Sequence, residues 1–245
     1  MPKTSLTPFE EASKPEKENI EKTKALFGEQ IKNYIDFYEL LYNLHEHVGN
    51  QSIAKNIIFD NRESVVLMIS ARIVVTSKAY LDLVLKGYYY DLEVVFRSLV
   101  ESINVMRLLV ECKDIEKANR YAKKWLKGKL DLQTVKQELN LTENKQFSLG
   151  YGELCDYVHS NFKAVRILIK PDFILGSIDA SPKPAFKPDF VSNALFPHTK
   201  IVVSLLLENF QNIIEIEFKT QTIVVLKKLN EERERLKQRT KNDLS

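Results

Sequence analysis

The sequence has few of the residues that turn the chain or end helices. Its 245 residues contain only seven glycines and eight prolines. An all-β fold needs many tight turns and therefore many of these residues, so their scarcity favours long helices. We predict an all-α fold, a single helical bundle of about six to seven helices. Four of the prolines lie between residues 171 and 188, which predicts one long proline-rich loop at 170–197.

Cysteines and long apolar runs are also scarce. Cys112 and Cys155 provide neither a disulfide framework nor the spacing of metal ligands, as expected in a reducing compartment. The N-terminus has no apolar segment typical of a signal peptide. Charged residues such as Arg72 and Lys78 interrupt the most apolar helix, although a membrane span needs about 20 apolar residues. We therefore expect a cytoplasmic protein that does not enter a membrane.

No motif for a nucleotide cofactor or an acyl-enzyme is present: the P-loop, the dinucleotide fingerprint and the nucleophile elbow are all absent. His45 and His47 are two residues apart, so on a helix they point to opposite sides and cannot share a metal ion. We interpret His45 as a core histidine and His47 as a solvated one. Glu153, Asp156 and His159 lie at spacings of three, but the Glu-x-x-His pairs of a di-iron bundle are missing. We therefore expect no metal and no cofactor.

The chain divides into three predicted regions. Residues 1–18 are polar and hold three prolines, so we expect them to be disordered. Residues 19–230 form the bundle, and residues 231–245 form a charged tail. The first helix should end at Gly49-Asn50, with an apolar stripe that includes Ile35 and Tyr42. The predicted helices span about 19–48, 62–86, 88–112, 114–127, 131–140, 148–169 and 198–237.

Two charged residues stand among apolar ones in the helix at 88–112. Arg97 and Glu101 are four residues apart, so they share one side of the helix. A buried charge is costly unless it is paired, so the pair is either a structural lock or part of a site. His159 faces the apolar side of a later helix and could approach Arg97. Arg97, Glu101 and His159 are therefore the candidate catalytic residues for metal-free phosphodiester cleavage. The alternative is a structural ion pair and a core histidine.

A basic stripe follows in the next helix. Residues 113–129 contain seven basic and two acidic side chains. Lys117, Arg120, Lys124 and Lys127 recur at steps of three and four, opposite a face formed by Tyr121 and Trp125. Such a stripe could follow a phosphate backbone, so these four residues are the candidate nucleic-acid-binding residues. The alternative is a helix face that is simply solvated.

Three stretches together resemble a known group of proteins. They are an apolar helix ending at Gly87, a helix with FRSLVES at 96–102, and a later helix with YVHSN at 157–161. This pattern is similar to the HEPN-like superfamily of all-α prokaryotic domains, over roughly residues 60–170. The resemblance implies a dimeric helical bundle, and for many members an RNase of a toxin–antitoxin or phage-defence system. Their active site is an Arg-x4–6-His motif on one helix. No histidine here follows an arginine at that spacing, so the resemblance supplies no catalytic residue.

Two functional hypotheses follow. The first is a HEPN-like protein that acts on RNA, either as a metal-independent endoribonuclease or as an RNA-binding component of a defence or toxin system. The second is a non-catalytic helical module that binds a partner protein. Whether the chain is an enzyme stays open at this point. Under both hypotheses we expect a homo-oligomer.

Overall fold

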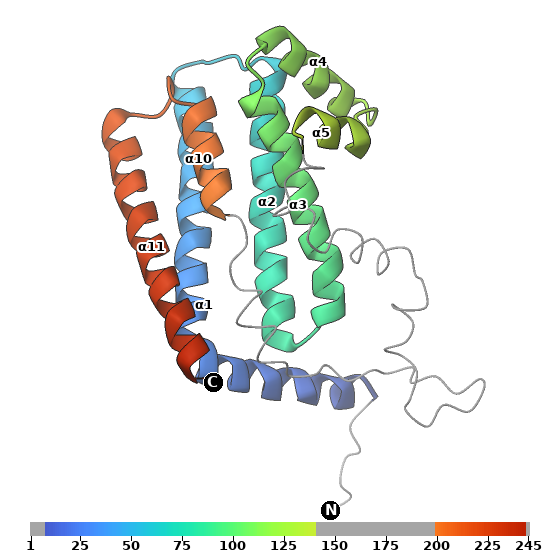
Figure 1. Cartoon of the computed structure of the whole chain (residues 1–245), viewed down its shortest axis with the longest axis vertical. Helices are drawn as coiled ribbons and strands as arrows, with labels where there is room; N and C mark the ends of the chain where they lie inside the picture. The colour runs from blue at the N-terminus through green and yellow to red at the C-terminus, as the bar shows by residue number, and fades with distance from the viewer. Residues whose placement is uncertain (1–7, 141–198, 244–245) are drawn as a thin grey trace, which may run out of the picture.

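A computed structural model describes residues 8–140 and 199–243, and this part of the chain is built from helices alone (Figure 1). The predicted all-α fold is therefore confirmed for the described residues. Their seven helices are α1 (Pro8–Ala54), α2 (Asn61–Lys86), α3 (Tyr89–Glu111), α4 (Ile115–Leu126), α5 (Leu132–Glu138), α10 (Thr199–Asn209) and α11 (Ile216–Asp243). The predicted helix at 148–169 and the predicted loop at 170–197 lie outside the described residues.

The α2–α3 hairpin packs against α1, α4 and α10, and local sequence signals set its ends. The Asp60 carboxylate accepts the Glu63 N–H at 2.8 Å, and the Glu63 side chain accepts the Asp60 N–H at 3.1 Å. This reciprocal capping box starts α2. Gly87 ends α2 in a left-handed conformation, with φ of 88°, which glycine adopts without steric cost. The predicted break at Gly87 is confirmed, and it lets α2 and α3 pack side by side.

Helix α1 is longer than the sequence pattern predicted. The expected stop at Gly49-Asn50 is wrong, because α1 continues to Ala54. Its other end begins at Pro8, inside the region expected to be disordered. The helix bends at Phe27, whose φ of −125° and ψ of 24° are not helical, and the part before the bend lies across the lower end of the bundle (Figure 1).

Contacts with the α2–α3 turn explain why the part of α1 before the bend has a defined structure. The Tyr88 hydroxyl donates a hydrogen bond to the Glu16 carboxylate at 2.7 Å. The Asn19 side-chain amide donates to the Lys86 carbonyl at 3.0 Å. Because these partners lie about 70 residues away in sequence, the local composition of residues 1–18 gave no sign of them.

The C-terminal segment forms two helices where one was predicted. The chain turns at residues 210–215, between α10 and α11, although no glycine or proline occurs there. Phe210 is 1% exposed and packs against Phe59, with 5.4 Å between ring centroids. The Lys55 ammonium donates to the Ile213 carbonyl at 3.1 Å. Tertiary contacts with the loop after α1 therefore hold the turn. Residues 231–243 continue α11, so the charged segment is helical as far as Asp243.

The main core lies where α1, α2, α3 and α10 meet. It contains fully buried side chains such as Leu41, Leu44 and Leu206. Two members of the predicted stripe of α1 do not belong to it, because Ile35 and Tyr42 are 37% and 44% exposed. The helix is therefore rotated relative to the predicted stripe.

By length and composition alone, α2 could cross a membrane, and it is the one helix among the described residues for which this holds. The core helix of a soluble bundle passes the same test. In this structure α2 packs against α1, α3 and α4, which accounts for its apolar composition.

Candidate nucleic-acid interface

Helix α4 carries the predicted basic stripe, and its sequence separates charged from apolar side chains. Asp114 caps the helix by accepting the Lys117 N–H at 3.0 Å, as its position before the apolar pattern predicted. Ala118, Tyr121 and Ala122 are buried against the rest of the bundle. The basic residues therefore occupy the side of α4 that faces solvent.

A single asparagine fastens α4 to the start of α2. The Asn119 amide donates to the Asp60 carboxylate at 3.0 Å, and its carbonyl oxygen accepts the Arg62 N–H at 2.9 Å. Asp60 is also the cap of α2, so one network joins the N-terminal end of α2 to the middle of α4. Helix α4 is thus held in a fixed orientation relative to the bundle. The sequence gives no signal for this role of Asn119, because its partners lie at the start of α2.

Lys117 forms a close ion pair, which the predicted basic stripe did not include. Its Nζ lies 2.7 Å from the Glu138 carboxylate of α5 and 5.7 Å from the centre of the Tyr121 ring. The hydrogen bond between Lys117 and Glu138 raises the pKa of Lys117 and lowers the pKa of Glu138. Lys117 therefore ties α4 to α5. Arg120 lies 3.9 Å from Glu116, and both are exposed, so this pair is weak.

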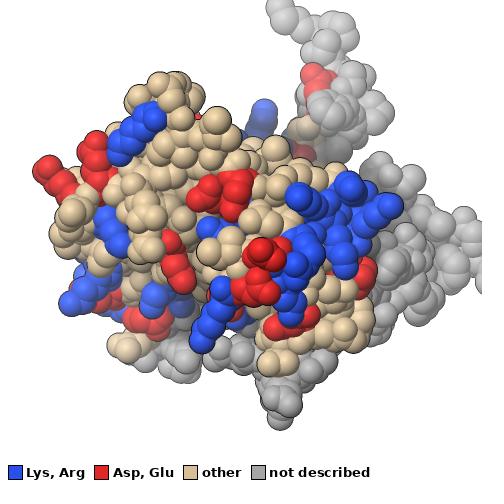
Figure 2. All heavy atoms as spheres, turned by 90° about the horizontal axis from the view of Figure 1, so that it is seen from above, with Lys and Arg blue, Asp and Glu red and all other residues tan. Residues whose placement is uncertain are grey.

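Four lysines at the end of α4 leave their charges in solvent. Lys123, Lys124, Lys127 and Lys129 are exposed, and within the described part of the chain they form no ion pair. Lys123 and Lys129 lie outside the predicted stripe but extend it. Seen from the end of the bundle where α4 lies, Figure 2 shows basic side chains gathered on one side, with acidic ones beside them. Lysines at a helix C-terminus also interact favourably with the helix dipole, which is the structural alternative to a binding role.

The backbone at the end of α4 has a defined geometry. The Gly128 N–H donates to the Trp125 carbonyl at 2.9 Å, and the Lys129 N–H donates to the Lys124 carbonyl at 2.8 Å. Gly128 has φ of 65°, so it supplies the left-handed residue of a Schellman motif. The predicted stop at Gly128 is confirmed. The last lysines are thus carried by an ordered turn.

The predicted pair of α3 is present as an ion pair. The Arg97 Nε donates to Glu101 Oε1 at 2.8 Å, and the two side chains are 15% and 28% exposed. The pair is therefore partly buried. His159, the third candidate catalytic residue, lies outside the described residues, so its approach to Arg97 stays a prediction.

A second pair of the same kind lies further along α3. Arg107 donates to both oxygens of Glu111, from Nε at 2.7 Å and from Nη2 at 3.1 Å. This pair was not among the predicted site residues, although its four-residue spacing is the same. Because α3 carries two such pairs, the spacing alone does not mark Arg97 and Glu101 as a site.

The two histidines of α1 face different neighbours, as their spacing predicted. His45 Nδ1 lies 2.8 Å from the Ser70 hydroxyl of α2. His47 stacks on Phe218 of α11, with ring centroids 3.7 Å apart, so the prediction of a simply solvated His47 is wrong. Burial lowers the pKa of both imidazoles. No group of three or more potential metal ligands occurs among the described residues, and Glu153 and Asp156 lie outside them.

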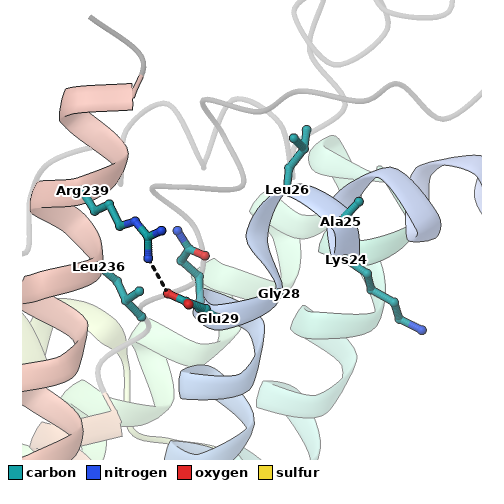
Figure 3. A pocket seen from close by; sticks show the side chains of 8 residues that line it. Lys24, Ala25, Leu26, Gly28, Glu29, Leu236 and Arg239 are labelled. Carbon is teal, nitrogen blue, oxygen red and sulfur yellow. Dashed lines mark hydrogen bonds and ion pairs between the residues drawn. The ribbon is translucent and has the colours of Figure 1, made fainter.

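A pocket of about 300 Å³ lies beside the bend of α1, between α1 and α11 (Figure 3). Arg239 reaches across it to Glu29, with 3.1 Å between Nη1 and Oε2. The other lining residues include Lys24, Leu26 and Leu236. None of the predicted site residues lines this pocket, and its arginine is already paired. It therefore offers no catalytic constellation.

Comparisons with protein-family models, with curated proteins and with solved structures found no match to this chain. Its function is therefore inferred from the residues and their geometry.

Proposed function

We propose that this protein binds RNA through the solvent face and C-terminal end of α4. The observation that carries the proposal is the group of exposed lysines at positions 123, 124, 127 and 129, which form no ion pair with described residues. Lysines that neutralise phosphates release bound counterions, and this release provides most of the sequence-independent affinity for nucleic acids. Because Lys117 is engaged by Glu138, the available charge lies toward the end of the predicted stripe.

The attachment of α4 to its neighbouring helices supports a role in RNA binding. Asn119 fixes the helix to α2, and Lys117 fixes it to α5, so the exposed lysines are presented from an ordered platform. Lys124 also extends over Tyr121, with 6.0 Å from its Nζ to the ring centre, and this contact restrains the side chain. Preorganised charges lose less conformational entropy when they bind.

The choice of RNA over other polyanions comes from the resemblance of residues 60–170 to HEPN-like proteins. RNA cleavage within a toxin–antitoxin or phage-defence system is the finer form of the proposal. In that mechanism Arg97 stabilises the charge that builds on the phosphate, Glu101 orients the guanidinium, and His159 transfers a proton. The Arg97–Glu101 ion pair is compatible with such an orienting role, since Glu101 contacts Nε.

The binding proposal is tested by titrating the protein with fluorescently labelled single-stranded RNA at several salt concentrations. If four lysines contact four phosphates, the plot of log affinity against log salt should have a slope of roughly −3, at about 0.7 for each contact. Lys124→Gln and Lys127→Gln should each flatten this slope by about 0.7. Lys227→Gln with Lys228→Gln is the matched control, because both lysines are exposed on α11. No measurable affinity at low salt, or an equal loss in the control, would contradict the proposal.

The alternative function, protein binding without catalysis, is favoured by a different surface. Four apolar side chains of α1 and α2 are exposed: Ile35, Tyr42, Met68 and Val75. This surface does not include the lysines of α4. Variants of the two surfaces therefore separate the two functions.

A further inference from the structure

Glu138, at the end of α5, brings its carboxylate to a group of donors on α4. Its Oε2 lies 2.7 Å from the Lys117 ammonium. The Tyr121 hydroxyl donates to the same carboxylate, and burial and then this hydrogen bond raise the pKa of Tyr121. The ammonium groups of Lys117 and Lys124 lie 5.7 Å and 6.0 Å from the centre of the Tyr121 ring. One ammonium and one hydroxyl of α4 therefore hold the carboxylate, and a second ammonium lies by the same ring.

The spacing of these donors on α4 suits an anion. Lys117, Tyr121 and Lys124 lie at steps of four and three, so they share one side of the helix. A phosphate oxygen accepts the same charge-assisted hydrogen bonds from ammonium and hydroxyl donors as a carboxylate does. The exposed lysines of the candidate interface continue along the chain from Lys124. The donors that hold Glu138 are thus the next ones along α4 for a phosphate backbone bound at its C-terminal end.

The contact between Lys117 and Glu138 can open without a change in the bundle. Their side chains are 38% and 33% exposed, so both can be reached from solvent. Ion pairs at such exposure contribute little to stability, because water and salt screen them. Each helix also has an attachment other than this pair, since the buried Val135 packs α5 into the core and Asn119 binds α4 to the start of α2. A rotation of the Glu138 side chain is therefore enough to free the donors.

We propose that Glu138 competes with RNA phosphate for Lys117 and the Tyr121 hydroxyl, and so limits the affinity of the α4 interface. This competition rests on the RNA binding proposed for α4, and it adds to that site a phosphate position that the protein itself occupies. While Glu138 holds the two donors, the lysines at positions 123, 124, 127 and 129 carry the binding. When the charge of Glu138 is removed, Lys117 and Tyr121 provide a fifth phosphate contact. Glu138 is therefore an inhibitory contact built into the fold.

Titration of Glu138→Gln with labelled single-stranded RNA tests the competition. Glutamine keeps the size of the side chain but not its charge, so the fold should persist, which a circular dichroism melt checks. The slope of log affinity against log salt should steepen from about −2.8 to about −3.5, because one more phosphate is neutralised. Since the slope changes by about 0.7, the affinity at roughly 0.1 M salt should rise by about fivefold. Lys117→Gln alone should leave the slope near the parent's value, because Glu138 already engages Lys117.

Two further variants separate the competition from a general effect of charge. In the Lys117→Gln background, Glu138→Gln should not steepen the slope, because the cation that it frees is absent. Glu116→Gln is the matched control, since it removes one carboxylate from α4 itself. The Glu116 side chain is 92% exposed and lies 3.9 Å from Arg120, too far for a hydrogen bond, so this variant should keep the parent's slope.

These results are separable from a failure of RNA binding itself. If neither the parent nor Glu138→Gln binds RNA, both proposals are overturned. If the parent binds RNA and Glu138→Gln keeps the parent's slope, the competition is overturned and the binding proposal stands. A steeper slope that persists without Lys117, or that Glu116→Gln produces equally, also overturns the competition.

Discussion

The two ion pairs of α3 provide a matched test of whether Arg97 and Glu101 contribute to stability or are held for function. Each pair joins an arginine to a glutamate four residues later, at 2.8 Å for Arg97–Glu101 and 2.7 Å for Arg107–Glu111. The arginines are equally shielded, at 15% and 16% exposed. The glutamates differ, since Glu101 is 28% exposed and Glu111 is 41% exposed.

These exposures set the expected magnitudes. Removing one partner of a fully buried pair costs about 3–5 kcal/mol, whereas an exposed pair contributes about 0.2–1 kcal/mol. Because Arg97 and Glu101 are partly buried, Glu101→Ala should lower the free energy of unfolding by about 1–3 kcal/mol, between these limits. The Arg107–Glu111 pair should contribute less, about 0.5–1 kcal/mol, because Glu111 is more solvated and lies at the C-terminal end of α3, where the helix dipole disfavours a carboxylate.

Urea unfolding of the single and double alanine variants of each pair gives the two coupling energies. An unchanged free energy of unfolding in Arg97→Ala, or a larger coupling energy for Arg107–Glu111 than for Arg97–Glu101, would contradict these magnitudes. An Arg97→Ala protein that is more stable than the parent would indicate a residue held for function at a cost in stability. The RNA titration of the same variant would then show whether binding or cleavage is lost.

Three further predictions concern the core, the histidines and the chemistry. Leu206→Ala should lower the free energy of unfolding by about 2–5 kcal/mol, because Leu206 is fully buried, whereas Val224→Ala should change it by less than about 0.5 kcal/mol. Stability should decrease as the pH falls below the ordinary histidine pKa of 6.5, because burial lowers the pKa of His45 and the unfolded chain binds the proton more readily. His45→Gln should make this decrease shallower between about pH 7 and pH 5, and parallel curves would contradict the assignment. If the protein cleaves RNA, His159→Ala should abolish cleavage in the presence of a chelator without unfolding the chain; a parent that is active only with added divalent metal would rule the mechanism out.

Local signals in the sequence were enough to predict several helix ends and one ion pair. Asp114 caps α4, and Gly87 and Gly128 end α2 and α4, because the groups involved lie within a few residues of one another. The Arg97–Glu101 pair follows from the helix repeat in the same way. The scarcity of glycine and proline determined the all-α class, since it excludes a fold built from many tight turns.

Tertiary structure decided the features whose partners are distant in sequence. The turn between α10 and α11 depends on contacts with Phe59 and Lys55, so no residue within the turn predicted it. Lys117 could be assigned to a basic stripe from its spacing, but only the packing of α5 against the bundle brought Glu138 to it and removed its charge from the candidate interface. Hydrophobic periodicity placed Tyr42 in the core, yet a helix rotated by a fraction of a turn exposes it. A sequence states which side chains share a helix face, whereas the neighbouring helices determine which face is buried.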